Sequence, residues 1–290
     1  MKIATAAYDI ALVRTWDAYA DRIAAWVAEA AGQGADLLVF PEYAGLELAG
    51  LAGEGSRDRA TSLRMASDLA PRACALHADL ARQHDVHILM GSGPVAAGGG
   101  FVNRAHFFAP SGAMAHQDKQ IMTRFEREEW GISAGGPLKL FDTALGRIGV
   151  LICYDSEFPL LGRALADADL ILIPSVTEAL AGHTRVRISA RARALEQQCV
   201  TAMASLIRGH PEIFGIEEGE GRGAIFGPPD NGFPEDGILA SGPLNTPGWT
   251  YADVDPAAIA RVRAEGTVLN HRHWEEQIPR ANPITLTELR

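Results

Sequence analysis

Short apolar runs alternate with alanine-rich segments of helical period along this chain. The β-branched residues of these runs, and the Gly and Pro that bound them, predict buried strands. The strands are expected at Lys2–Tyr8, Asp36–Phe40, Val86–Gly91, Arg147–Ile152, Asp169–Pro174 and Val200–Ile207. Apolar residues at helical spacing predict helices over Thr15–Ala31, Arg57–His84 and Thr184–Gln198, with Pro71 dividing the second segment into one or two helices. The alternation predicts an α/β fold with buried parallel strands.

The segments between these elements predict turns and loops. Phe101–Ala109 and Ala113–Gln117 favour a hairpin, and the glycines of Leu46–Ser56 favour a loop. Asp118–Gly136 is polar and aperiodic, and a loop of this length is often functional. No linker composition divides the chain, so residues 1–290 are expected to form a single domain. Its last part, about 265–290, is expected to be an extended tail that wraps a neighbouring subunit.

Composition narrows the class of protein. Of the 290 residues, 47% are hydrophobic and 21% charged, as in ordinary globular proteins. The net charge of −10 argues against nucleic acid or an anionic membrane surface as a partner. The N-terminus does not resemble a signal peptide, and no run is long enough to span a bilayer. Three scattered cysteines suit a reducing compartment, so the cytoplasm is the expected location.

Three reactive side chains fall at the ends of predicted strands. Cys153 follows one apolar strand and precedes a helical pattern, which is where open α/β sheets place their ligand crevices. Glu42 ends another strand, and Lys119 follows the second strand of the hairpin. A nucleophilic thiol needs a base to take its proton and a positive group to hold the oxyanion. Taken singly, however, the three also fit a buried thiol, a solvated acid and a surface lysine.

Four motifs in one order carry a more specific signal. They are VFPE ending at Glu42, K-x-x-x-T-R-F-E from Lys119 to Glu126, GVLICYDSEFP around Cys153, and RARALEQQ from Arg191 to Gln198. The chain resembles the nitrilase superfamily of carbon–nitrogen hydrolases over nearly its whole length. The resemblance implies a four-layer αββα sandwich whose subunits pair through the helices that follow the nucleophile, as a homodimer or a larger homo-oligomer.

The resemblance also implies a Glu–Lys–Cys catalytic set. Cys153 would be the nucleophile, and Glu42 the general base. Lys119 would stabilise the tetrahedral oxyanion, with the backbone N–H of Tyr154 as a second donor. Glu126 fits best as the family's second glutamate, which positions substrate or orients Lys119. Glu128 and Glu129 are nearby alternatives for that place, and a solvated charge run is preferred for Glu128.

Departures from the family pattern concern the substrate. Many members have an arginine before the Phe-Pro step and a glutamate after it, where this chain has Glu157 and Leu160. If Glu157 faces the pocket, it would disfavour substrates that bear a carboxylate, although a glutamate is also common at a helix N-terminus. Further candidates for the pocket are Glu129, Glu178 and His183. His271 and His273 alternate as two metal ligands would, but they lack a third ligand, so no metal or cofactor is expected.

The predicted activity is hydrolysis of a small linear amide or N-carbamoyl compound through a thioester. A nitrilase, and an acyltransferase that passes the same thioester to an amine, are alternatives. A catalytically silent binding protein on the same scaffold is an alternative from another class. The combination of TRFERE, CYDSEFP and RVRI resembles an uncharacterised, amidase-like bacterial branch of the superfamily. Members of this branch are sometimes found beside acetyltransferase-like domains. No such domain is expected within these residues.

Overall fold

The computed structural model describes residues 1–281 and 283–290, and position 282 of the predicted tail lies outside the described residues. Within them, thirteen strands form one continuous sheet. The strands are β1 (Lys2–Asp9), β2 (Leu37–Val39), β3 (His87–Ala97), β4 (Gly100–Phe108), β5 (Met114–Asp118), β6 (Ile132–Ser133), β7 (Phe141–Thr143), β8 (Gly146–Val150), β9 (Leu170–Val176), β10 (Val200–Ile207), β11 (Ala224–Phe226), β12 (Ile238–Ser241) and β13 (Gly248–Asp253). The helices are α1 (Trp16–Gly32), α2 (Arg59–His84), α3 (Pro159–Ala164), α4 (Leu180–Gln197), α5 (Pro256–Glu265) and α6 (Asn270–His273), with shorter helical turns η1 (Ala44–Arg57), η2 (Glu126–Trp130), η3 (Cys153–Glu157) and η4 (Trp274–Arg280).

Strand β1 lies at the centre of the sheet and joins its two halves. This strand pairs in parallel with β2 on one edge. On its other edge it pairs with β13 along residues 2–7 and then with β10 along residues 7–9. The main path therefore runs β5-β4-β3-β2-β1-β10-β9-β8-β7, and its two halves fold over one another.

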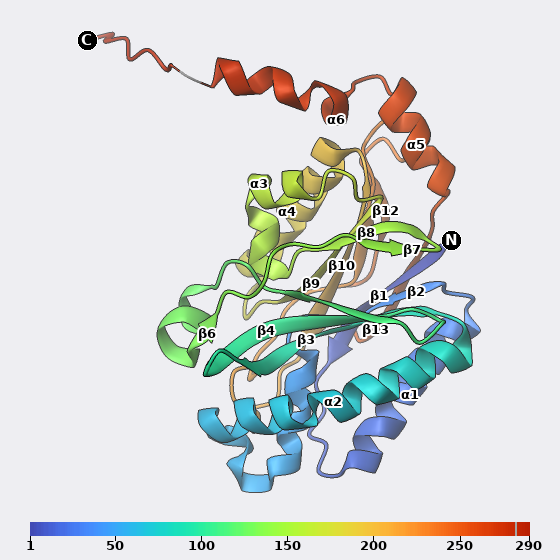
Figure 1. Cartoon of the computed structure of the whole chain (residues 1–290), viewed down its shortest axis with the longest axis vertical. Helices are drawn as coiled ribbons and strands as arrows, with labels where there is room; N and C mark the ends of the chain where they lie inside the picture. The colour runs from blue at the N-terminus through green and yellow to red at the C-terminus, as the bar shows by residue number, and fades with distance from the viewer. Residues whose placement is uncertain (282) are drawn as a thin grey trace.

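Helices cover both outer faces of the folded sheet, α1 and α2 on one side and α3 and α4 on the other (Figure 1). Successive side chains of a strand point to opposite faces of the sheet and pack in different layers. Ile3 points to the core between the two halves, whereas Ala4 packs toward α1 and α2. The free ends of the sheet also meet, because the ring centroids of Phe107 and Phe141 are 5.4 Å apart. The predicted four-layer sandwich is confirmed, with a sheet that is nearly closed into a barrel.

Two local predictions are wrong. The expected glycine-rich loop is the 3₁₀ segment η1, whose buried Glu47 accepts hydrogen bonds from the Tyr8 hydroxyl (2.5 Å) and the Ala11 N–H (2.8 Å). Within the expected extended tail, residues 270–280 are helical, and the Arg163 guanidinium lies over the Trp274 ring. Both helical segments depend on contacts with distant residues, which a local pattern does not show. None of the helices in the described residues is long and apolar enough to cross a membrane.

A glycine in β3 supports the chain turn that carries Glu42. Gly91 has φ +78°, and a β-carbon there would lie 2.1 Å from the Pro41 carbonyl oxygen. The pairing of β3 with β4 shifts at this point, between Leu89 and Ser92. The shift lets the Ser92 N–H reach the Pro41 carbonyl (3.2 Å), and the Ser92 hydroxyl accepts the Tyr43 N–H (3.2 Å). The bulge therefore fixes the residues on both sides of Glu42.

We expect Gly91→Ala to lower the free energy of unfolding by about 3 kcal/mol, from the left-handed backbone and the clash together. Gly98→Ala is the matched control, because Gly98 also has positive φ (+58°) but a β-carbon there would have no other atom within 4 Å. It should cost only about 1 kcal/mol. Urea denaturation of the two variants measures the difference, and equal losses would show that the approach to Pro41 is not tight.

Candidate active site

Three turns of the chain bring Glu42, Lys119 and Cys153 together. Glu42 follows β2, Lys119 follows β5, and Cys153 begins η3 just beyond β8. Each side chain is at most 5% exposed, yet all three line one cavity of about 1220 Å³. Because β2 and β8 are parallel members of the sheet, their carboxyl ends open toward the same place. The three residues that the sequence singled out thus lie at the floor of a single cavity.

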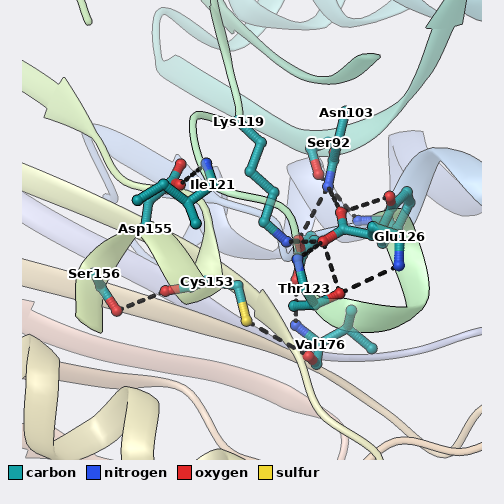
Figure 2. Close-up of polar contacts among 12 residues, drawn as sticks. Ser92, Asn103, Lys119, Ile121, Thr123, Glu126, Cys153, Asp155, Ser156 and Val176 are labelled. Atoms are coloured by element: carbon teal, nitrogen blue, oxygen red, sulfur yellow. Dashed lines mark hydrogen bonds and ion pairs between the residues drawn. The ribbon is translucent and has the colours of Figure 1, made fainter. Parts of the chain in front are cut away.

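The Lys119 ammonium is held between two carboxylates (Figure 2). Its Nζ lies 2.7 Å from Glu42 Oε1 and 2.6 Å from Glu126 Oε2. The Asn103 amide, from β4, donates to both acids, at 3.0 Å to Glu42 and 3.1 Å to Glu126. Burial alone lowers the pKa of Lys119, but the two carboxylates outweigh it and raise that pKa, so the lysine keeps its charge.

Glu126 has the larger set of donors. Besides Lys119 and Asn103 it accepts from the Tyr43 hydroxyl (2.8 Å) and from the Thr123 N–H and hydroxyl (both 2.9 Å). Burial raises the pKa of Glu126, but Lys119 and these donors more than offset it, and the pKa is lowered overall. Glu126 therefore remains an anion that anchors the lysine.

Glu42 is in a different electrostatic position. Besides Lys119 and Asn103 it accepts the Val176 N–H, 3.1 Å from Oε2, and it contacts the Cys153 thiol. Burial raises the pKa of Glu42, Lys119 offsets this only in part, and the neighbouring charge of Glu126 raises the pKa again. Of the two acids that share one cation, Glu42 is the one that takes up a proton more readily.

Cys153 is held in an uncommon backbone conformation. Its φ is +48°, in the left-handed region that non-glycine residues rarely adopt. The Ser156 hydroxyl donates to the Cys153 carbonyl (2.6 Å), and buried Arg193 donates to the Ser156 carbonyl (2.9 Å). Burial, and then contact with Glu42, raise the pKa of the Cys153 thiol, which lies 3.6 Å from the Val176 carbonyl oxygen. The thiol is therefore protonated and sits beside an acceptor for that proton.

The residues after Cys153 complete the floor of the cavity. Tyr154 lines it and lies in the first turn of η3, where a backbone N–H has no acceptor within the helix. The Asp155 carboxylate accepts from the backbone N–H groups of Gln120 (3.1 Å) and Ile121 (2.8 Å), as Figure 2 shows in part. Asp155 thereby ties the cysteine turn to the loop that begins at Lys119.

Comparison with known proteins identifies the family. The model of the carbon–nitrogen hydrolase family matches residues 2–264. The chain belongs to the carbon–nitrogen hydrolases. It is 32% identical over 270 residues to the probable hydrolase YhcX of Bacillus subtilis. The match covers 92% of this chain and 52% of YhcX. The chain thus spans about half the length of the curated relatives that it matches first.

Other relatives lie within the same superfamily. Omega-amidase NIT2 of Danio rerio is 25% identical over 257 residues, or 85% of this chain and 86% of that protein. Among solved structures, an amidase from Nesterenkonia sp. is 25% identical with a TM-score of 0.68, covering 94% and 96% of the two chains. Saccharomyces cerevisiae Nit3, a member of branch 10 of the nitrilase superfamily, has a TM-score of 0.71 at 21% identity, covering 91% and 93%. The last likeness bears on the fold alone.

The predicted pocket residues divide into two groups. Glu157 and Glu178 line the cavity, and Glu157 lies 3.5 Å from Arg185. Among the residues that the structure describes, Glu129 and His183 are not part of the lining. Burial lowers the pKa of His183 to about 4, so it packs as a neutral ring behind the wall. Glu128 does line the cavity and pairs with Arg124 (2.8 Å), rather than being solvated only.

Several residues of the site were not singled out by the sequence. Tyr43 and Asn103 bond directly to the two acids, and Tyr43 also has positive φ (+56°). Trp130 and Phe125 line the cavity from the segment predicted as a long loop, which contains the π-helical turn η2. Tyr43 directly follows the VFPE motif, and that position was the one available signal. Asn103 lies in the middle of a hairpin strand and offered none.

No metal centre is evident in the described part of the hydrolase, where no group of three or more potential ligands occurs. His271, considered above as a ligand, has its Nε2 3.0 Å from the Ala166 carbonyl oxygen and so ties α6 to the body of the fold.

We predict that Asp155 makes the free energy of unfolding depend on pH, and that Asp155→Asn removes this dependence. Burial raises the pKa of Asp155 to about 7. A carboxyl group whose pKa is raised on folding stabilises the protein below its unfolded pKa of about 4, and this stability is lost as the pH rises to about 7. Asparagine does not titrate. We therefore expect the stability of wild type relative to the variant to fall from pH 4 to 7 and then stay level, as measured by urea unfolding. A difference that is constant over this range would contradict the expectation.

Proposed function

We propose that this carbon–nitrogen hydrolase cleaves a small linear amide through a thioester on Cys153, with Glu42 as the proton carrier and Lys119 as the oxyanion donor. The observation that carries the proposal is the state of the Lys119 ammonium. It has three N–H groups, and two of them are bonded to Glu42 and Glu126. Within the described residues the third N–H has no acceptor. The Lys119 side chain lines the cavity beside the Cys153 thiol, so this N–H is available to a ligand there.

The acylation step follows from these positions. The Cys153 sulfur attacks the amide carbon while its proton passes to Glu42. The carbonyl oxygen becomes an oxyanion that accepts the third N–H of Lys119 and the backbone N–H of Tyr154. When the C–N bond breaks, Glu42 gives the proton to the leaving ammonia or amine. A glutamate with a raised pKa suits this exchange, because it must take and return a proton near neutral pH.

Deacylation uses the same groups in reverse. Water attacks the thioester carbon and gives a proton to Glu42, which returns it to the departing sulfur. The carboxylic acid leaves, and Cys153 is a thiol again. Glu126 takes no proton in this scheme, since its donors hold it as an anion, and it serves to fix Lys119.

An amide is favoured over a nitrile by the extent of the similarities. The match to omega-amidase NIT2 of Danio rerio runs over 85% of this chain, whereas the match to Nitrilase 1 of Arabidopsis thaliana runs over 50%. We also propose a homodimer or larger homo-oligomer, a single domain over 1–290 and a cytoplasmic location. The three free and buried cysteines are compatible with a reducing compartment.

Glu42→Gln should lower kcat/KM for a neutral amide about 10³-fold, since glutamine can still face Lys119 but cannot accept the thiol proton. Glu129→Gln is the matched control, because this exposed glutamate lies outside the cavity lining, and its kcat/KM should stay within about twofold of wild type. Ammonia release measures both variants. If Glu42→Gln kept a tenth of the activity, Glu42 would not be the proton carrier.

Intact-protein mass measurement tests the thioester and separates the alternatives. During turnover of an amide, we expect the acyl group on the peptide that contains Cys153, and its loss in Cys153→Ala. Turnover of nitriles alone would indicate a nitrilase, and a trapped hydroxamate that exceeds the free acid would indicate acyl transfer to amines. A binding protein would neither turn over nor react faster with an electrophile at Cys153 than at Cys74 or Cys199, which lie outside the cavity lining of the described residues.

A further inference from the structure

The charges around the cavity do not balance. Seven glutamates and four basic residues line it. Three of the cations are matched by carboxylates: Lys119 by Glu42 and Glu126, Arg124 by Glu128, and Arg185 by Glu157. Three further lining carboxylates, Glu178, Glu217 and Glu218, form no ion pair with any residue that the structure describes. Within those residues, Arg127 is the one lining cation that forms no ion pair. The three unpaired carboxylates outnumber this single cation, so the cavity favours a positively charged ligand.

The three unpaired carboxylates stand on one wall. Glu178 belongs to the loop after β9, and Glu217 and Glu218 belong to the loop between β10 and β11. Two hydrogen bonds join these loops, from the Glu220 N–H to the Thr177 carbonyl (2.8 Å) and from the Thr177 hydroxyl to the Glu220 carbonyl (2.9 Å). The carboxylates are therefore presented by one tied surface, whereas Arg127 lies on η2.

The rest of the lining suits an alkyl chain. Met122, Phe125, Trp130 and Tyr154 contribute apolar surface to the lining. The volume of about 1220 Å³ lies above the usual range of small-molecule pockets, and so it is larger than an amide of two or three carbons requires. A substrate that fills it has a chain extending beyond the scissile bond.

We propose that the substrate is a linear amide whose chain carries a cationic amino or guanidino group, selected by Glu178, Glu217 and Glu218 over amides that carry a carboxylate. The proposal rests on the proposed function, because the amide must reach Cys153. Glu157 contributes little to this selection, since Arg185 neutralises it. The role that the sequence suggested for Glu157 therefore belongs to the three carboxylates of the neighbouring wall.

Matched five-carbon amides test the selection. We would compare 5-aminopentanamide, pentanamide and the monoamide of glutaric acid. The cationic amide should have a kcat/KM about tenfold above that of the anionic one at low salt, and the ratio should shrink at 1 M NaCl because exposed charges are screened. The double variant Glu178→Gln/Glu218→Gln should lower this ratio about fivefold. Glu235→Gln, an exposed glutamate outside the cavity lining of the described residues, is the control.

A second measurement does not depend on hydrolysis. The rates at which cationic aminoethyl and anionic sulfonatoethyl methanethiosulfonate modify Cys153 can be followed by peptide mass analysis. Wild type should react faster with the cationic reagent, and the double variant should lose most of this preference. Charge preference without amide turnover would refute the proposed function alone. Turnover of amides with no charge preference, or a preference unchanged in the double variant, would overturn the inference alone.

Discussion

The placement of one buried ammonium constrains the whole site. Lys119 is 1% exposed, and a lone charge at that depth would be strongly destabilising unless carboxylates matched it. The match comes from Glu42 after β2 and Glu126 on η2, and Asn103 of β4 bonds both acids. The turn after β2 must therefore meet β4 and the segment from Lys119 to η2 before the lysine can be buried. The geometry of the candidate active site is thus also a condition for folding this end of the sheet.

The two acids around that cation differ because their hydrogen bonds differ. Within the described residues, five N–H and O–H groups donate to Glu126, whereas three N–H groups donate to Glu42. Donors favour the charged form of a carboxyl group, so the pKa of Glu126 is lowered while burial keeps that of Glu42 raised. A symmetric pair would share a proton between them. The unequal surroundings assign it to the acid that contacts the thiol.

The sequence could predict the parts of the fold that depend on local pattern. Apolar runs placed the main strands, and the strand-end rule placed Glu42 and Cys153 at one edge of the sheet. The same reasoning failed where distant contacts decide the structure. The helical form of η1 depends on the pairing of Glu47 with Tyr8, and the place of His183 behind the wall depends on how α4 packs. Asn103 looks like any polar residue of a hairpin strand, because its partners are distant in sequence.

Backbone strain links this architecture to reactivity. Tyr43 and Cys153 both have positive φ, and each stands where a strand gives way to a turn at the cavity. Such conformations cost about 1 kcal/mol or more, and they persist only where surrounding contacts determine them. Tyr43 is fixed by Ser92 and Glu126, and Cys153 by Ser156, which Arg193 of α4 holds in turn. Each strained turn is thus held by hydrogen bonds from other elements of the fold, and the folded sheet between the two turns keeps the Cys153 thiol and Glu42 in contact.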